Sequence, residues 1–264
     1  FLSALLSPVL LAWPASLAAS SAAAAPASVG QAADPQALAD GLLRPAARRS
    51  APRKLDVNLP EQVSFETGAV RQADVSRDGR WLVLARLSGG YSELWLRSLD
   101  PGVSELPRRL APALADRLSP ALSPDARQLA FVGLEDDIKG DIYLLDLGRP
   151  DAAPRRLTGR DTEDGAPAFS ADGRTLYFHQ RLPGQGQRRI VALDLYAPAS
   201  ALRLLDTGGD ASAPAPSPDG ARLAFVSSRG GTSAVYLMDL PGGQARKLTT
   251  GSDAESSPRF TPDG

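Results

Sequence analysis

Acidic side chains recur at one position along this chain, four residues before a proline. Asp116, Glu163 and Asp210 each stand at that distance from a proline that opens a short apolar segment. A further copy has Asp253 and Glu255 on either side of the equivalent position. Carboxylates that converge from several repeats focus negative potential in a concavity, which attracts cations and basic peptides. The sequence therefore predicts a binding site at these five residues, with solvated loop carboxylates as the alternative.

Residues for covalent or acid–base catalysis are scarce. The chain has no cysteine and one histidine, His179. It also lacks the Gly-x-Ser-x-Gly nucleophile motif, the HExxH zinc motif and the phosphate-binding P-loop. His179 aligns with Val132 and Val226 in other copies of a repeat, a position typical of a packed side chain. We therefore expect no catalytic residue, no metal and no cofactor in this sequence.

A short turn motif of the type Ser-x-Asp-Gly provides the framework for these positions. It occurs five times, with Thr261 in place of Ser in the last copy, and its aspartates are 47, 47, 47 and 44 residues apart. Fixed spacing of this size indicates one supersecondary unit copied in tandem. Asp caps backbone N–H groups in a turn and Gly accepts a positive φ, so a structural role is expected for the aspartates. These are Asp78, Asp125, Asp172, Asp219 and Asp263. Ala126 replaces the glycine in the second copy, which predicts strain if φ is positive there.

Four apolar segments occupy each copy of the unit. They are short, rich in β-branched and aromatic residues, and separated by Gly, Pro, Asp and Ser, as β-strands are. Four strands in about 45 residues is typical of a β-propeller blade. The middle segments are almost continuously apolar, which predicts sheets buried on both faces. Asp146, Asp194 and Asp239 end the second segment in successive copies, where we expect them to accept hydrogen bonds within the blade.

The fold predicted is thus an all-β propeller of four-stranded blades over residues 59–264. It comprises four complete blades and the start of a fifth, which stops at its turn on Gly264. Val63 stands in the same relation to the first blade as the third segment of each copy does to the next blade. We therefore expect a strand there that belongs to the last blade and removes the open edge between the two ends.

The residues before the propeller divide into two segments. Residues 1–25 are apolar and then rich in Ala and Ser, without an initiator Met. The apolar run is shorter than the roughly 20 residues that span a bilayer, so we expect the remnant of a cleaved signal peptide rather than an anchor. Residues 26–58 form a Pro/Ala/Arg-rich linker arm, with a short helix expected from Asp34 to Arg44. Export predicts a periplasmic or secreted protein with no stable membrane span after cleavage.

The net charge of −1 provides no basic surface for nucleic acid. Partners are therefore sought among proteins and peptides, and the acidic loops favour basic ones.

The fourth copy carries the clearest pattern. Ser217-Pro218-Asp219-Gly220 is followed by Leu223-Ala224-Phe225, then Tyr236, Asp239-Leu240 and Leu248-Thr249. This pattern resembles the WD40-like repeat of the TolB propeller family, and the resemblance covers residues 59–264. It implies an exported, usually non-catalytic propeller of about six to eight blades that binds other proteins.

Two departures from the family pattern limit what is carried over. The first copy is degenerate, with Ala73 and Arg77 for prolines and Ser98 for the strand-ending aspartate. A sizeable α/β domain precedes the propeller of TolB itself, whereas a linker-like arm stands here.

These observations predict an exported, non-catalytic protein-interaction scaffold in the cell envelope. Similar blades also form the N-terminal gate of prolyl-oligopeptidase-like serine peptidases, so the alternative is the gating propeller of a secreted peptidase whose catalytic domain lies outside this sequence. A third option is one module of a larger envelope protein. Further blades downstream favour the scaffold, whereas a Gly-x-Ser-x-Gly region favours the peptidase.

Overall fold

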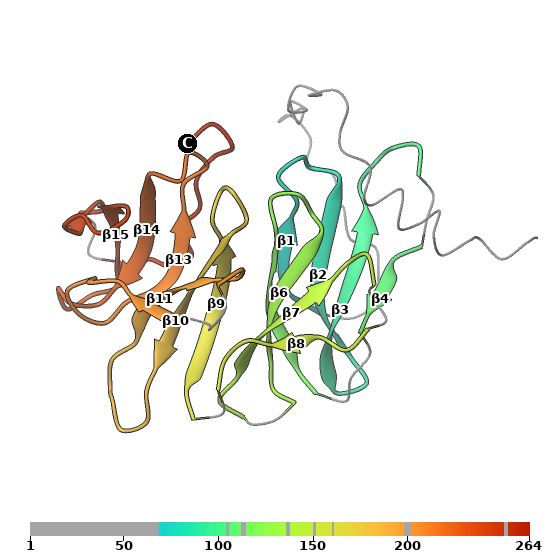
Figure 1. Cartoon of the computed structure of the whole chain (residues 1–264), viewed down its shortest axis with the longest axis horizontal. Helices are drawn as coiled ribbons and strands as arrows, with labels where there is room; N and C mark the ends of the chain where they lie inside the picture. Colours follow the sequence, from blue (N-terminus) through green and yellow to red (C-terminus); the bar gives the residue numbers. More distant parts are fainter. Residues whose placement is uncertain are drawn as a thin grey trace, which may run out of the picture. The chain divides into compact units, whose positions relative to one another are not determined.

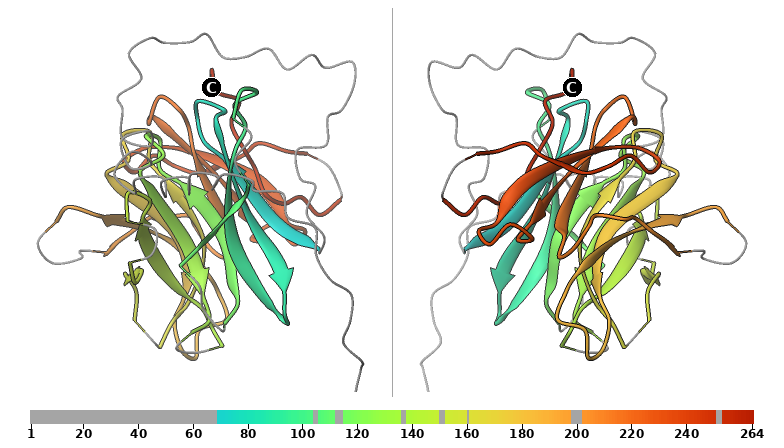
Figure 2. Two further views of the ribbon diagram at one scale, coloured as in Figure 1. Left: turned by 90° about the vertical axis from the view of Figure 1, so that its right-hand side faces the viewer. Right: turned by 90° about the vertical axis from the view of Figure 1, so that its left-hand side faces the viewer.

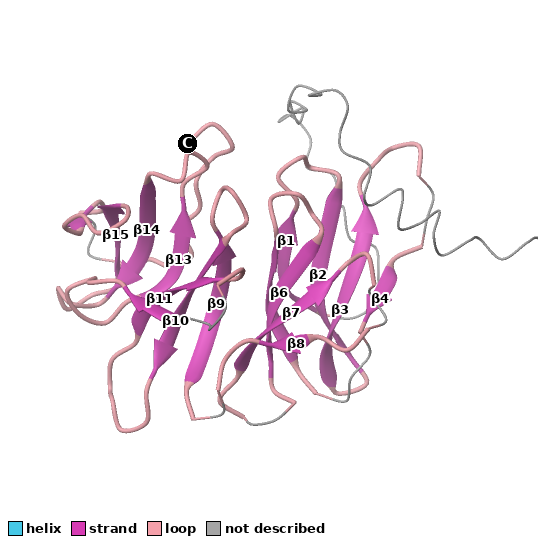
Figure 3. Ribbon diagram, viewed as in Figure 1, coloured by secondary structure: helices cyan, strands magenta, loops and turns pink. Residues whose placement is uncertain are grey.

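The computed structural model describes residues 69–264, apart from 104–105, 112–114, 136–137, 150–151, 160, 198–201 and 251–252. The described residues form strands, turns and loops, without a helix (Figure 3). The predicted all-β class is therefore confirmed. The predicted signal remnant, the linker arm with its helix and the strand near Val63 lie outside the described residues.

Four antiparallel sheets follow one another along the chain, and each is a meander of four consecutive strands (Figure 1). The first blade contains β1 (Val70–Val75), β2 (Trp81–Ser88), β3 (Tyr91–Ser98) and β4 (Arg108–Leu110). The second contains β5 (Arg117–Leu122), β6 (Gln128–Gly133), β7 (Asp141–Asp146) and β8 (Arg155–Arg156). The third contains β9 (Glu163–Phe169), β10 (Thr175–Arg181), β11 (Arg189–Asp194) and β12 (Leu202–Leu204). The fourth contains β13 (Ser212–Pro216), β14 (Arg222–Ser227), β15 (Ala234–Asp239) and β16 (Arg246–Lys247).

Apolar side chains fill each join between successive blades, which lie face to face in both views of Figure 2. Phe131, Phe178 and Phe225 occupy one equivalent position in β6, β10 and β14, are fully buried, and pack against the preceding blade. Alternate residues face the other way, so that Ala130 and Val132 join Phe178 in the next interface. Both faces of these strands are therefore buried, which explains their continuous apolar sequence.

Residues 253–264 begin a fifth blade. The Glu255 N–H donates to the Ser233 carbonyl at 2.9 Å, as the Ala211 N–H does to Arg188 at the preceding join. Phe260 then packs on the far face of the fourth blade, in a cluster with Leu237. The prediction of four complete blades and the start of a fifth is confirmed.

The Asp turns join the first and second strands of each blade through a repeated set of hydrogen bonds. In the third blade, the Ser170 hydroxyl donates to Asp172 Oδ1 at 2.6 Å, and the Arg174 N–H donates to the same oxygen at 3.0 Å. Ser170 Oγ in turn accepts the Thr175 N–H at 2.9 Å. Equivalent bonds occur at Asp78, Asp125 and Asp219, and the hydroxyl of Thr261 lowers the pKa of Asp263. The turn aspartates thus hold the chain reversal.

The strand-ending aspartates act more locally. Asp146 accepts the Gly148 N–H and Asp194 accepts the Tyr196 N–H, both at 2.9 Å. Each of these two carboxylates therefore caps the turn that leads to the outermost strand. In the fourth blade, the Asp239 carbonyl accepts the Gly243 N–H at 2.7 Å.

Each first strand contains a β-bulge where its register against the second strand shifts. In four successive copies the residue before the proline position has a positive φ: Ser119 (49°), Ala166 (49°), Ala213 (48°) and Ser257 (53°). Non-glycine residues seldom take this conformation. Its return in every one of these copies means that the bulge belongs to the repeat, and only small side chains occupy it.

Positive φ at the Asp turns yields a test of backbone strain. Gly79 has φ = 71° and no neighbouring atom within 4 Å of an added Cβ, so Gly79→Ala introduces strain without a clash. We expect a loss of about 1 kcal/mol in the free energy of unfolding, measured by urea denaturation. Gly242→Ala, where φ is not positive and the space is also open, is the matched control and should change stability by under about 0.5 kcal/mol. Equal effects of the two substitutions would contradict this account. Ala126, with φ = 55°, already carries such strain in the native chain.

A buried polar network spans the join between the second and third blades. Asp164 is 2% exposed and accepts hydrogen bonds from the Thr162 hydroxyl at 2.7 Å and the Gln180 amide at 3.1 Å. Asp141, fully buried on the neighbouring blade, pairs with Arg156 at 2.5 Å. Burial raises the pKa of Asp164, and the charge of Asp141 adds to the shift, although the hydrogen bonds oppose it. Ionised Asp164 therefore opposes folding.

Substitution of Asp164 by Asn should remove this cost. Because the native pKa is raised, the folded state binds the extra proton, and the stability of the parent falls as the pH rises through that pKa. We expect Asp164→Asn to match or exceed the parent in stability at neutral pH and to lose its advantage in acid. Urea denaturation from about pH 4 to about pH 8 measures this difference. Asp161→Asn, at an exposed position nearby, is the control; a pH-independent difference for Asp164→Asn would contradict the prediction.

Candidate functional site

One end of the blades gathers the loops that enter each first strand and the hairpins between second and third strands. This end is called the loop face, and the opposite end, with the Asp turns, the turn face. In an antiparallel meander the two kinds of loop must share an end. Hydrogen bonds between them confirm it: the Ser92 N–H donates to Asp116 at 2.7 Å and the Arg188 N–H donates to Asp210 at 2.8 Å. The predicted acidic residues therefore lie on the loop face.

Three of these carboxylates hold one blade to the next. Asp116 and Asp210 accept the backbone N–H groups just given, and Glu255 accepts that of Val235 at 3.3 Å. In each case the donor lies at or just before the start of the third strand of the preceding blade. The bonds to Asp116 and Asp210 satisfy backbone N–H groups at the blade edge. The Val235 N–H also donates to the Thr249 hydroxyl, at 3.1 Å. The acids thus have a structural function that the sequence did not indicate.

The acids stand at separate joins instead of meeting at one point. Across the part of the chain that the structure describes, no group of three Asp, Glu or His side chains could hold a metal ion. Glu163 pairs with Arg181, its neighbour on the adjacent strand, and Asp253 is exposed. Among the residues that the structure describes, no backbone N–H group donates a hydrogen bond to the side chain of Glu163 or Asp253.

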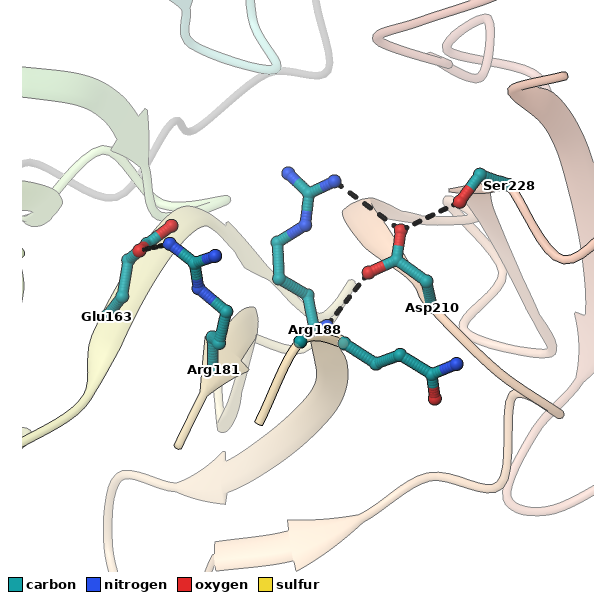
Figure 4. Close-up of a pocket in the computed structure, with 7 residues that line it drawn as sticks. Glu163, Arg181, Arg188, Asp210 and Ser228 are labelled. Carbon is teal, nitrogen blue, oxygen red and sulfur yellow. Dashed lines mark hydrogen bonds and ion pairs between the residues drawn. The ribbon is translucent and has the colours of Figure 1, made fainter. Parts of the chain in front are cut away.

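A pocket of about 470 Å³ opens on the loop face between the third and fourth blades (Figure 4). Its charged side chains come from four segments: Glu163 at the start of β9, Arg181 at the end of β10, Arg188 before β11, and Asp210 before β13. The hydroxyl of Ser228, after β14, donates to Asp210 at 3.1 Å. Both acids were predicted as binding residues from the sequence, whereas the arginines were not. The position of these arginines in the sequence could have identified them, because both flank the hairpin between the second and third strands of the third blade.

Asp210 is ionised in this setting. Burial opposes its ionisation, but hydrogen bonds from Arg188 outweigh burial and hold the pKa of Asp210 below its ordinary value. The pocket therefore contains two carboxylates and two guanidinium groups, and their charges cancel. Such a site suits charged groups of a partner better than an apolar ligand.

His179 lies on β10, two residues before Arg181 of the pocket. Its imidazole packs against Gly165 on the neighbouring strand, where an added Cβ would lie 2.6 Å from Nε2. Burial lowers the pKa of His179 to about 4, and the charge of Arg188 contributes. Nδ1 is buried without a hydrogen-bond partner among the described residues. The side chain is thus neutral at neutral pH and part of the packing, as its alignment with valines suggests.

Membrane-spanning helices were also sought over the described ranges, and none is long and apolar enough to cross a bilayer.

The sequence was compared with family models and with known proteins. No family model matches the chain. An uncharacterised protein of Agrobacterium fabrum is 29% identical over 219 residues, which cover 78% of this chain and 71% of that protein. A TolB homologue of Chlorobium luteolum is 29% identical over 171 residues, which cover 64% of this chain and 36% of the homologue. This chain therefore spans only about a third of the TolB homologue.

Solved structures agree on the architecture. A structure described as putative TolB from Agrobacterium tumefaciens matches with a TM-score of 0.57 and 26% identity, covering 70% of this chain and 68% of that one. A puromycin-hydrolysing peptidase of Mycobacterium tuberculosis matches with a TM-score of 0.53 and 17% identity, covering 66% of this chain and 28% of the peptidase. The second likeness shows a shared fold alone. The repeat, the four meander sheets and these relatives together show that the chain has a TolB-like β-propeller fold.

Proposed function

We propose that this protein is an exported, non-catalytic scaffold that binds a protein partner in the cell envelope through its loop face. The TolB-like blades support an interaction role, as the resemblance to the TolB family implies, and the small-residue run after the N-terminal apolar segment supports export. The observation that carries the choice of face is the charged pocket between the third and fourth blades, which lies open on the loop face.

The acids divide into two groups in this proposal. Asp116, Asp210 and Glu255 fix the blade joins and set the shape of the loop face. Glu163 and Asp253 face solvent and are available to basic side chains of the partner, since Glu163 is 34% exposed and Asp253 is exposed. Exposed ion pairs contribute little individually, so these two residues tune the affinity and orientation of the partner.

The absence of native cysteine allows a direct test of the face. Gly186→Cys places one thiol on the loop face and Gly242→Cys places one on the turn face, both in open space and without positive φ. Each protein is labelled with a benzophenone maleimide and irradiated in an extract of the native cell envelope. We expect a discrete cross-linked partner from position 186 and none from position 242. Equal adducts from both positions, or none from either, would count against the loop face.

The acidic contribution is measured in the same system. Glu163→Gln combined with Asp253→Asn should weaken binding of the cross-linked partner about two- to fivefold at low salt. Asp239→Asn removes an exposed carboxylate from the turn face and should have no effect. If the double variant binds the partner as tightly as the parent does, the partner does not use basic groups to contact Glu163 and Asp253.

The alternative function is the gating propeller of a serine peptidase, and the likeness of the blades to those of a peptidase structure supports it. His179, the one histidine of this chain, is buried and neutral and does not suit a general base. We expect a fluorophosphonate probe, which labels activated serines, to leave the native full-length protein unlabelled. Covalent labelling at a serine would favour the peptidase.

A further inference from the structure

The four charged residues of the loop-face pocket form a row. Figure 4 shows them in the order Glu163, Arg181, Arg188 and Asp210, so that the two arginines stand between the two acids. Each arginine is held from the outer side of the row, Arg181 by Glu163 and Arg188 by Asp210. The inner sides of the two guanidinium groups therefore face the middle of the pocket.

Asp210 does not depend on the Arg188 guanidinium for its hydrogen bonds. Its carboxylate already accepts the Arg188 backbone N–H at 2.8 Å and the Ser228 hydroxyl at 3.1 Å, whereas the guanidinium contact is longer, at 3.4 Å. A guanidinium has five N–H donors. Arg188, whose side chain is 41% exposed, thus keeps most of its donors for another acceptor.

Arg181 is equally accessible. Its side chain is 43% exposed, and its contact with Glu163 runs through Nη2. Two arginines that are fixed at one edge and open at the other are arranged to share one oxyanion, because each can donate to it without losing its own acid.

We propose that this arginine pair binds the carboxylate of an acidic side chain of the protein partner. The inference deepens the proposed function and rests on it. The row carries two positive and two negative charges, so a singly charged carboxylate fits it better than a doubly charged phosphate. Its flat, two-oxygen geometry also matches the fork of a guanidinium. The partner then carries an acidic residue for the arginine pair beside basic residues for Glu163 and Asp253.

The imidazole of His179 provides a way to measure ligand binding in the pocket. It is the one histidine of the chain, and the charges that act on it are those of Arg188, Glu163, Asp210 and Arg181, the same four residues. An anion that binds between the arginines stabilises the imidazolium form and moves the pKa of His179 upward. The imidazole resonances therefore report directly on occupancy of the pocket.

The test is a titration of the full chain, without a histidine tag, followed by NMR of the His179 imidazole. The probe is a capped Gly-Ser-Glu-Ser-Gly peptide, compared with its Glu-to-Gln counterpart and with inorganic phosphate at the same ionic strength. We expect a saturable shift of the His179 resonances at about pH 7, where the Glu carboxylate is ionised, with the Glu peptide and none with the Gln peptide. Arg188→Gln keeps the backbone N–H that Asp210 needs and should weaken binding about tenfold. Arg181→Gln should do the same, and Arg246→Gln, on the exposed outer strand β16, should leave it unchanged.

The outcomes separate this inference from the proposed function. It is overturned if the Glu peptide gives no saturable shift, if the Gln peptide acts equally, if phosphate binds as tightly as the peptide, or if both arginine variants bind like the parent. Cross-linking from position 186 with no peptide binding would reject the carboxylate site alone. Peptide binding with no cross-linked partner would reject the scaffold function and leave a site for carboxylates.

Discussion

The structure depends on sheets that bury both of their faces. A phenylalanine at one repeated position, Phe131, Phe178 and Phe225, is inserted into the preceding blade, while its sequence neighbours pack on the following one. A single four-stranded sheet of this kind would expose an apolar face to water, so no blade is stable without its neighbours. Each blade is stabilised by its contacts with the blades on either side. The sequence of a loop can therefore vary only where the change leaves both packed faces intact.

The sequence predicted the fold well because the blade is specified by short-range sequence signals. Turn residues, strand length and apolar runs repeat together, and each signal needs only a few neighbouring residues. The candidate site was less predictable. The acids were recognised by their spacing, but Asp116 and Asp210 turned out to accept backbone N–H groups of the preceding blade. That function depends on which strand ends meet across a join, and spacing along one copy does not contain this information.

The loop face shows how one residue type serves two purposes. A carboxylate that accepts a backbone N–H stabilises the join between two blades. A carboxylate that pairs with an arginine side chain, as Glu163 does, orients a charged group on the surface. Asp210 does both, since its three donors include the backbone and the guanidinium of Arg188. The pocket was missed because arginines are common in this chain, and only the hairpin of the third blade brings Arg181 and Arg188 beside the acids.

The bulge of the first strands has a consequence for how successive blades are held together. Pro120, Pro167 and Pro214 have no N–H to donate, and the positive φ just before each one interrupts the edge. Between β1 and β5 the free edge groups are met by side chains, since Gln72 accepts the Ser119 N–H and Asp74 accepts the Leu122 N–H. Neighbouring first strands therefore do not pair by backbone hydrogen bonds into a continuous barrel. In such a barrel, the hydrogen-bond register would fix the circumference. The packing of apolar blade faces, rather than a hydrogen-bond register between first strands, therefore holds successive blades together.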